Sequence, residues 1–147
     1  MHIVGVDPGF SGAISVINES LNVVETMKLK DATWVEVIAM LNRVDRPCFA
    51  MLEQVHSMPR QGVASSFKFG TSFGGLQASL AAAAVPYEMV TPSKWQRSLG
   101  CLSKGDKNVT KNMAQRLFPN EKVIHATADS LLIAYYAMKV WKGEGNG

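Results

Sequence analysis

The sequence has few cysteines, few charged residues and no long apolar run. Its two cysteines, Cys48 and Cys101, form neither a CxxC pair nor a spacing typical of metal ligands, so reduced, buried or half-buried thiols are expected. No apolar run approaches the length needed to cross a bilayer, and the first residues lack the basic segment and cleavage site of a secretory signal. These absences favour a cytoplasmic protein with no membrane partner.

What remains is the composition of a globular protein. Of the 147 residues, 47% are hydrophobic and 18% are charged, which is typical of a folded chain with its own core. The length suits one domain, which we expect over residues 1–142, followed by a flexible Gly-rich tail over 143–147. The chain contains no internal repeat and no interior low-complexity linker.

The two halves of the chain differ in charge. Residues 1–54 contain four Lys or Arg and seven Asp or Glu, a net charge of −3, whereas residues 55–147 contain eleven and five, a net charge of +6. A basic second half suits a polyanionic partner such as DNA. A solvated lysine surface explains the same count equally well.

Apolar runs bounded by turn residues predict five strands, over residues 2–6, 12–18, 22–29, 47–52 and 87–90. Helical spacing and capping residues predict five helices, over residues 33–43, 64–84, 92–97, 106–117 and 124–141. Asp31 or Thr33 is the expected cap of the first helix, and Thr91 caps the third, with Pro92 at its first position.

The predicted helix over residues 64–84 is unusual, because it contains glycines at positions 70, 74 and 75. An interior glycine costs a helix about 1 kcal/mol relative to alanine. Close packing against a neighbouring element would offset this cost. We expect Phe67, Leu76 and Leu80 on the inner side of this helix.

In chain order, three antiparallel strands precede two strands that alternate with helices. This order predicts an α/β protein with a five-stranded mixed sheet, three antiparallel strands then two parallel ones, flanked by helices. It is the element order of an RNase H-like fold.

Three of the twelve acidic residues stand out, because each adjoins an apolar segment. Asp7 and Glu53 directly end the predicted strands that begin at residues 2 and 47, and Asp129 precedes an apolar stretch of the last helix. A carboxylate at such a place needs compensation for its desolvation, and a divalent cation supplies it. If the first and fourth strands are neighbours, the three acids meet and form a site for Mg²⁺ or Mn²⁺.

Taken singly, each acid has a simpler explanation. Asp7, followed by Pro8-Gly9, is typical of a turn, Glu53 can pair with an arginine, and Asp129 can face solvent. Only the combination favours a metal site. Two ions in such a site would stabilise the attacking water and the leaving oxygen in phosphodiester hydrolysis.

Several segments together resemble a known family. Residues 3–9 (IVGVDPG), 51–55 (MLEQV) and 128–134 (ADSLLIA) resemble the three acidic motifs of RuvC-type Holliday junction resolvases. Residues 62–70 (GVASSFKFG) and 90–95 (VTPSKW) are similar to the phage-encoded branch of that family. The resemblance runs from residue 1 to about residue 140. Each motif is weak alone, and the ordered set is specific.

The resemblance implies a site with four metal ligands, of which Asp7, Glu53 and Asp129 are three. The family has a fourth ligand three residues before the last Asp, and here that position is Ala126, which cannot bind metal. His125 lies one residue further back on the same helical face, and we assign the fourth role to it. A histidine nitrogen would tilt the preference toward Mn²⁺. A surface histidine near a helix start is the alternative.

The resemblance also implies a lysine against the scissile phosphate, and this position falls on Lys107. A second basic position falls on Gln96, which has basic neighbours. The expected DNA contacts are therefore Arg60, Lys68, Lys94, Arg97, Lys104 and Lys107. The aromatic residue that stacks on a base in bacterial relatives falls on His56, so either the role is lost here or His56, Phe67 or Phe69 takes it.

By this resemblance, the chain is expected to cut four-way and other branched DNA by paired symmetric hydrolysis, with Mg²⁺ or Mn²⁺ in a two-ion site and no covalent intermediate. Asp7, Glu53, His125, Asp129 and Lys107 are the expected catalytic residues. Two symmetric nicks require two sites, so a C2 homodimer follows, with the Gly-rich helix as a candidate contact. The expected setting is a bacterial or phage-infected cell.

Two alternatives stay open, and a third is excluded by length. A broader nuclease would also cut flaps or forks. A junction-binding protein with a degenerate site would explain Ala126. An actin-like ATPase also begins with a strand running into Asp-x-Gly, but 147 residues do not accommodate its two domains.

Overall fold

The structure, a computed structural model, describes residues 1–55 and 61–144. Its strands are β1 (His2–Asp7), β2 (Ala13–Asn18), β3 (Val23–Lys28), β4 (Cys48–Glu53) and β5 (Tyr87–Val90). Its helices are α1 (Trp34–Arg43), α2 (Val63–Ala82), α3 (Pro92–Leu99), α4 (Lys107–Leu117) and α5 (His125–Trp141). All ten predicted elements are present, and their ends differ from the predicted ones by at most two residues.

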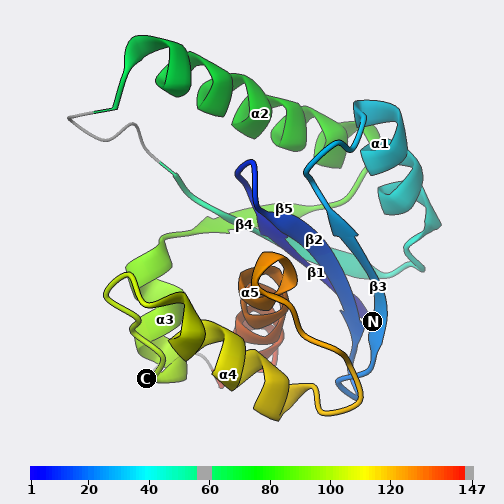
Figure 1. Ribbon diagram of the computed structural model, residues 1–147. Coiled ribbons are helices and arrows are strands. Elements are labelled where there is room, and N and C mark those ends of the chain that lie inside the picture. Colours follow the sequence, from blue (N-terminus) through cyan, green and yellow to red (C-terminus); the bar gives the residue numbers. More distant parts are fainter. Residues whose placement is uncertain (56–60, 145–147) are drawn as a thin grey trace.

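The strands form one mixed sheet in the order β3-β2-β1-β4-β5. β1, β2 and β3 pair antiparallel, whereas β4 pairs parallel with β1 and with β5. Helices α1 and α2 cover one face of the sheet, and α3, α4 and α5 cover the other (Figure 1). The predicted α/β architecture with an RNase H-like fold is thereby confirmed.

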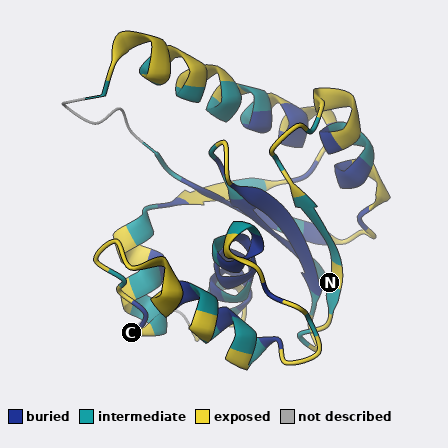
Figure 2. Ribbon diagram, in the orientation of Figure 1, coloured by how far each residue is buried: buried dark blue, intermediate teal, exposed yellow. Residues whose placement is uncertain are grey.

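Alternation along the strands divides the core between these two faces. On β1, Val4 and Val6 belong to the cluster beneath α1 and α2, whereas Ile3 belongs to the cluster around α5. Because side chains alternate along a strand, Gly5 and Asp7 face α5 as well. In Figure 2 the central strands and much of α5 are buried, whereas the outer helices carry many exposed residues.

Local polar contacts set the ends of several elements. The Thr33 side chain accepts from the Glu36 backbone N–H (3.2 Å), and the Glu36 carboxylate accepts from the Thr33 backbone N–H (2.7 Å). This capping box begins α1, so Thr33 rather than Asp31 is its cap.

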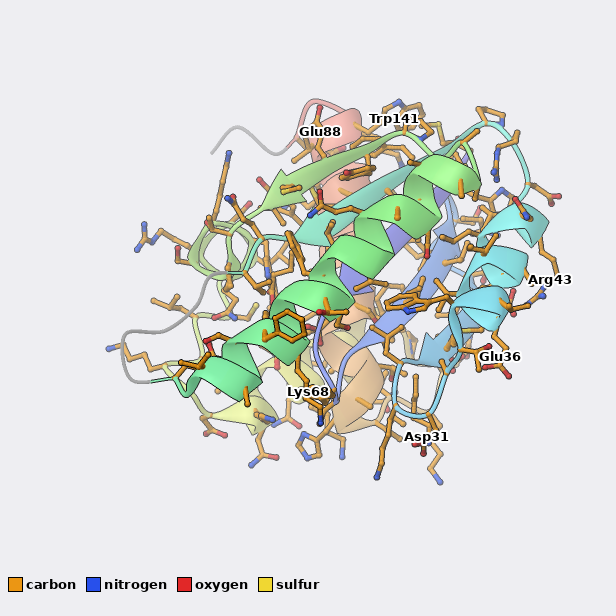
Figure 3. The ribbon with its side chains drawn as sticks, turned by 90° about the horizontal axis from the view of Figure 1, so that it is seen from above. Asp31, Glu36, Arg43, Lys68, Glu88 and Trp141 are labelled. Carbon is orange, nitrogen blue, oxygen red and sulfur yellow. The ribbon has the colours of Figure 1, made fainter. Side chains whose placement is uncertain are left out.

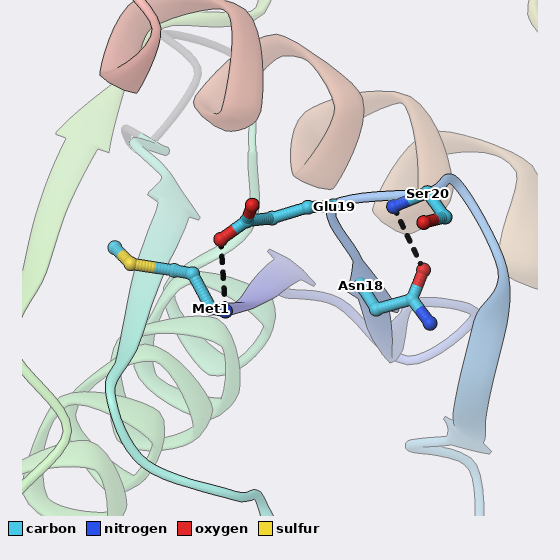
Figure 4. A network of polar contacts seen from close by, with 4 residues as sticks. All are labelled: Met1, Asn18, Glu19 and Ser20. Carbon is cyan, nitrogen blue, oxygen red and sulfur yellow. Dashed lines mark hydrogen bonds and ion pairs between the residues drawn. The ribbon is translucent and has the colours of Figure 1, made fainter.

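The turn between β2 and β3 is closed by Asn18, whose side chain accepts from the backbone N–H of Ser20 at 3.0 Å. Next to it, the Met1 amino group and the Glu19 carboxylate form an ion pair at 2.8 Å (Figure 4). These contacts tie the start of β1 to the turn that joins β2 and β3.

Not all of the residues expected on the inner side of α2 are buried. Leu76 and Leu80 are buried as predicted, but the expectation for Phe67 is wrong, because its side chain is 76% exposed. Only the C-terminal half of α2 packs on the sheet, and Phe67 lies in the other half. Figure 3 looks down on α2 where it crosses the strands, with Lys68 on the exposed half.

The glycines of α2 differ from one another in the same way. A Cβ on Gly75 would lie 2.3 Å from the Trp34 ring, so this glycine permits α1 and α2 to pack closely. A Cβ on Gly70 or Gly74 would meet nothing within 4 Å. The predicted close packing therefore holds within this chain for Gly75 only.

Cys48 and Cys101 are both buried and free of disulfides, as expected. Among the described residues, no helix is both long and apolar enough to cross a membrane.

Candidate active site

The ends of β1 and β4 bring two carboxylates to one edge of the sheet. Asp7 is the last residue of β1 and Glu53 the last of β4. In the parallel pair, Gly5 is aligned with Met51 and Val6 with Leu52. The same register carried one residue further puts Asp7 beside Glu53, on the face that packs against α5.

Gly5 determines how closely α5 lies on β1. A Cβ at position 5 would lie 2.0 Å from the Ser130 carbonyl oxygen and 2.5 Å from the Ala134 backbone nitrogen. Only glycine permits this contact between backbones. Since Asp129 directly precedes Ser130, the contact brings Asp129 to the Asp7 end of β1.

A buried pair of hydroxyl groups also stabilises the packing of α5 on the sheet. The Ser15 and Ser130 side-chain oxygens lie 2.6 Å apart, and Ser130 donates to the Thr127 carbonyl oxygen at 2.9 Å. Ser15 is aligned with Gly5 across the β1–β2 pair. The first turns of α5 are thus fixed at the centre of the sheet.

The turn after Asp7 is equally tight. The Gly12 N–H donates to the Gly9 carbonyl oxygen at 3.2 Å. A Cβ on Gly12 would lie 2.0 Å from the Asp7 carbonyl oxygen. The chain therefore folds back directly on the backbone of Asp7, which holds this residue in place.

Negative charge is concentrated around Asp7, and this affects the pKa values of the acids. Burial raises the pKa of Asp7 well above its ordinary value, the nearby Glu53 and Asp129 carboxylates raise it further, and Lys107 opposes them. Burial also raises the pKa of Asp129, against a side-chain hydrogen bond with Thr110 and the charge of Lys107. The three acids therefore interact with one another, which makes the site short of positive charge.

The pKa of Glu53 is also raised. Burial raises its pKa to about 7, the hydrogen bond from Trp95 lowers it, and the Asp129 charge raises it. That bond joins the Trp95 Nε1 and the Glu53 Oε2 over 2.7 Å. Trp95 lies on α3 and is fully buried.

The three acids lie near one another, but their side chains do not form a complete set of metal ligands. In residues 1–55 and 61–144, no three His, Cys, Asp or Glu side chains are arranged to hold a metal ion. Glu53 is bonded to Trp95 and Asp129 to Thr110, so two of the three carboxylates are directed to neutral protein donors. In donor type and charge the three acids fit Mg²⁺ or Mn²⁺.

His125 is the first residue of α5, and its side chain is exposed. It lies four residues before Asp129, about one helical turn away. No hydrogen bond or ion pair links it to another residue in the described part of the chain. Its role as a fourth ligand stays a prediction.

Most of the expected DNA contacts lie on the α3–α4 side. Lys107 begins α4, where its charge acts on Asp7 and Asp129. Lys94 and Arg97 are exposed on α3, and Lys104 is exposed in the loop before α4.

The remaining expected contacts lie elsewhere. The Lys68 amino group, on α2, lies 5.5 Å from the centre of the Phe10 ring, in the turn that follows Asp7. The expected base-stacking substitutes differ in exposure, Phe67 being exposed and Phe69 half-buried. Arg60 and His56 lie outside the described residues.

A cleft of about 460 Å³ adjoins the site on the α1–α2 side. Its lining includes Phe10, Lys30, Asp31 and Trp34. None of the three acids lines it, because they face α5 across the sheet. The three acids therefore lie on the opposite face of the sheet from this cleft.

Reasoning from the sequence did not single out three residues that shape the site. Gly5 is one, and a glycine inside an otherwise apolar strand is the signal that could have identified it. Trp95 and Thr110 are the other two, since they bond Glu53 and Asp129. Nothing local in the sequence distinguishes these two from ordinary core residues.

Cys101 also lies near the acids, but it is unsuited to nucleophilic chemistry. Its side chain is buried, and burial together with the Asp129 charge raises its pKa to about 11. At neutral pH the thiol stays protonated, whereas the thiolate is the reactive form.

The chain has the RNase H-like fold, and solved structures of similar shape share it over nearly the whole length. T. thermophilus RuvC in complex with Holliday junction substrate superposes with a TM-score of 0.73 at 19% identity, covering 98% of each chain. A structure of Thermus thermophilus RuvC superposes with a TM-score of 0.71 at 20% identity, with the same coverage. No family model matches the sequence, and no curated protein matches it significantly. At this identity the likeness establishes the fold.

Proposed function

We propose that this chain is a metal-dependent endonuclease that resolves four-way DNA junctions by paired phosphodiester cuts, and that it belongs to the phage-like branch of the RuvC-type resolvases. One observation carries the proposal. Asp7, Glu53 and Asp129, from three separate elements, interact at one edge of an RNase H-like sheet. A protein of the same fold has been solved on a Holliday junction.

The charge balance of the site supports a role for divalent cations. Three desolvated carboxylates with raised pKa values destabilise one another unless a cation compensates them. Asp7, Glu53 and Asp129 would hold Mg²⁺ or Mn²⁺, with His125 as the proposed fourth ligand. The bound ions would activate a water and neutralise the leaving 3′-oxygen, so that a 5′-phosphate remains.

The chain's own cations would bind and orient the DNA. Lys107 is proposed to contact the scissile phosphate, since its charge already acts on Asp7 and Asp129. Lys94, Arg97 and Lys104 would bind flanking phosphates from the α3–α4 side, and Lys68 from the side of α2. Arg60, outside the described residues, is proposed as a further phosphate contact. Such contacts supply affinity that weakens as salt increases.

A second copy of the chain is part of the proposal, because a two-fold symmetric junction needs two active sites. The outer half of α2 is the proposed contact. Val63 is 88% exposed and Phe67 76% exposed there, and Gly70 offers open space for a close approach. Phe67→Asp should shift the protein toward the monomer in sedimentation measurements and leave its fold intact.

The test is cleavage of a synthetic four-way junction in the presence of Mg²⁺ or Mn²⁺. Wild-type protein should cut two opposed strands symmetrically, and chelation of the metal should stop the reaction. Asp7→Asn keeps the shape of the side chain and removes its charge, so it should abolish cleavage while junction binding persists. Lys142→Ala, at the far end of α5, is the matched control and should cut normally.

Other substrates separate the alternatives. Equal cleavage of flaps and forks would replace junction resolution by a broader nuclease activity. Tight junction binding without cleavage in either metal would sink the nuclease proposal and favour a binding protein with a degenerate site.

A further inference from the structure

Trp95 is a core residue that also contacts the candidate site. It is the one residue of α3 that is buried, with an exposed fraction of 0%, so its ring holds this short helix on the core. Its indole N–H also donates to the Glu53 Oε2 at 2.7 Å. A single side chain therefore links α3 to one of the three acids.

The choice of acceptor points to function. A buried indole N–H needs a hydrogen-bond partner, and a backbone carbonyl would satisfy it without a buried charge. Here the acceptor is a carboxylate, which is costly to desolvate. A bond from a neutral donor to a carboxylate is also short, directional and stronger than a bond between neutral groups.

The bond occupies only one of the two Glu53 oxygens. Every buried side-chain nitrogen or oxygen in the described part of the chain has a hydrogen-bond partner, and Glu53 receives only the Trp95 bond. The second oxygen, Oε1, must therefore stay accessible. Rotation of the carboxylate would break the Trp95 bond to Oε2, so Oε1 is the oxygen left for a ligand.

We propose that Trp95 is a positioning residue, whose indole N–H holds the Glu53 carboxylate so that Oε1 is presented to the metal. This inference rests on the proposed function, because Glu53 is taken there as a ligand. It extends that function, since no metal-ligand motif includes Trp95. Groups that orient a ligand in this way usually contribute 10- to 100-fold to metal affinity or activity.

The contact itself is tested first, in protein without metal, by NMR of ¹⁵N-labelled tryptophan side chains. The chain has three tryptophans, and Trp34 and Trp141 are 42% and 48% exposed. The Trp95 indole N–H should exchange slowly with solvent, and Glu53→Gln should shift its resonance and leave the other two unchanged. If Glu53→Gln leaves the chemical shift of the Trp95 indole N–H unchanged, the inference is overturned.

Metal binding is tested next, by calorimetric titration with Mn²⁺. Trp95→Phe keeps an aromatic ring on the core and removes the donor, so we expect its Mn²⁺ affinity to fall by about 10- to 100-fold. Trp34→Phe and Trp141→Phe are matched controls and should bind Mn²⁺ as the wild type does. Wild-type affinity in Trp95→Phe would contradict the proposal.

Cleavage separates positioning from simple loss of structure. In Trp95→Phe, kcat on the junction should fall at subsaturating Mn²⁺ and recover in part at high Mn²⁺, while junction affinity stays unchanged. A parallel loss of junction affinity and folding stability, without Mn²⁺ recovery, would indicate a structural role only. If wild-type protein neither binds Mn²⁺ nor cleaves, the proposed function fails, whereas the NMR measurement still decides whether Trp95 holds Glu53.

Discussion

The two faces of the sheet are built from the same strands and do different work. On the α1–α2 face, β1 contributes Val4 and Val6 to an apolar cluster, and the outer half of α2 extends past it. On the α5 face, the same strand contributes Gly5 and Asp7, and α5 packs backbone to backbone against it. One face is a conventional core, and the other is a core with three acids at its edge.

The two faces differ in how much unfavourable free energy they contribute to the folded state. The acids of the α5 face are desolvated and repel one another, which raises their pKa values and destabilises the protein at neutral pH. The α1–α2 face contributes none of these three acids. The α5 face should therefore respond to pH and metal, and the α1–α2 face to packing and capping alone.

The largest effect is expected at Gly5. Gly5→Val should lower the free energy of unfolding by about 3 kcal/mol, the upper end of the usual cost of overpacking, because the new side chain would drive α5 away from β1. Urea unfolding monitored by circular dichroism measures the change. Mn²⁺ binding should disappear with it, since Asp129 moves with α5.

Gly74→Ala on the α1–α2 side is the matched control. Its Cβ would meet open space, and a helical alanine should raise stability by about 0.5–1 kcal/mol. Both variants are compared at the same low protein concentration, so that contacts through α2 do not enter. Equal destabilisation of the two variants would erase the distinction between the faces.

The next effect is a dependence of stability on pH in metal-free protein. Glu53 has its pKa raised to about 7 from 4.5, so the folded state binds a proton that the unfolded state releases. Its stabilising contribution is complete below pH 4.5 and is lost as the pH rises through about 7. The loss should approach about 3 kcal/mol, and the raised pKa values of Asp7 and Asp129 act in the same direction.

Glu53→Gln should remove its share of this dependence, so that at pH 8 the metal-free variant is more stable than the wild type. A thousandfold excess of Mn²⁺ over its Kd should reverse the order, since the wild type then gains about 4.1 kcal/mol, more than the pH-dependent loss. Unfolding midpoints across pH, with and without Mn²⁺, provide the measurement. A wild-type curve that is flat from pH 4.5 to 7 would speak against the buried, uncompensated site.

A smaller effect is expected for the cations of α3. Lys94 and Arg97 are exposed on the outside of the helix whose inner side holds Glu53. The double Lys94→Ala, Arg97→Ala variant should bind junction DNA more weakly, and the slope of its salt dependence should fall by about 0.9 for each phosphate that is no longer neutralised. Binding isotherms at several salt concentrations test this, with Lys142→Ala as the control. An unchanged salt slope would remove α3 from the DNA surface.

The smallest effect is expected on the α1–α2 face. Thr33→Ala removes the cap of α1 and should cost about 1 kcal/mol of stability. Mn²⁺ affinity and the pH dependence of unfolding should stay as in the wild type. Coupling of this cap to Mn²⁺ binding would mean that the two faces do not act separately.

Much of this organisation is predictable from sequence patterns. The apolar runs before Asp7 and Glu53 mark both strands, and the acid at each end identifies two members of the candidate site. The i, i+3, i+4 spacing of α1 and the Thr91-Pro92 start of α3 place those helices within two residues. The exposure of Phe67 is not predictable in this way, because helical periodicity does not tell which half of a long helix has a partner.

The sequence by itself determined the elements, the mixed order of strands and the three acids, since these depend on local periodicity and on residues next to one another in the chain. Only the tertiary structure decided which groups act on the acids. Trp95 reaches Glu53 across 42 residues, and Ser15 reaches Ser130 across 115. The role of Gly5 is evident only when α5 lies on it. Close packing of two backbones leaves no local sequence pattern beyond the glycine itself.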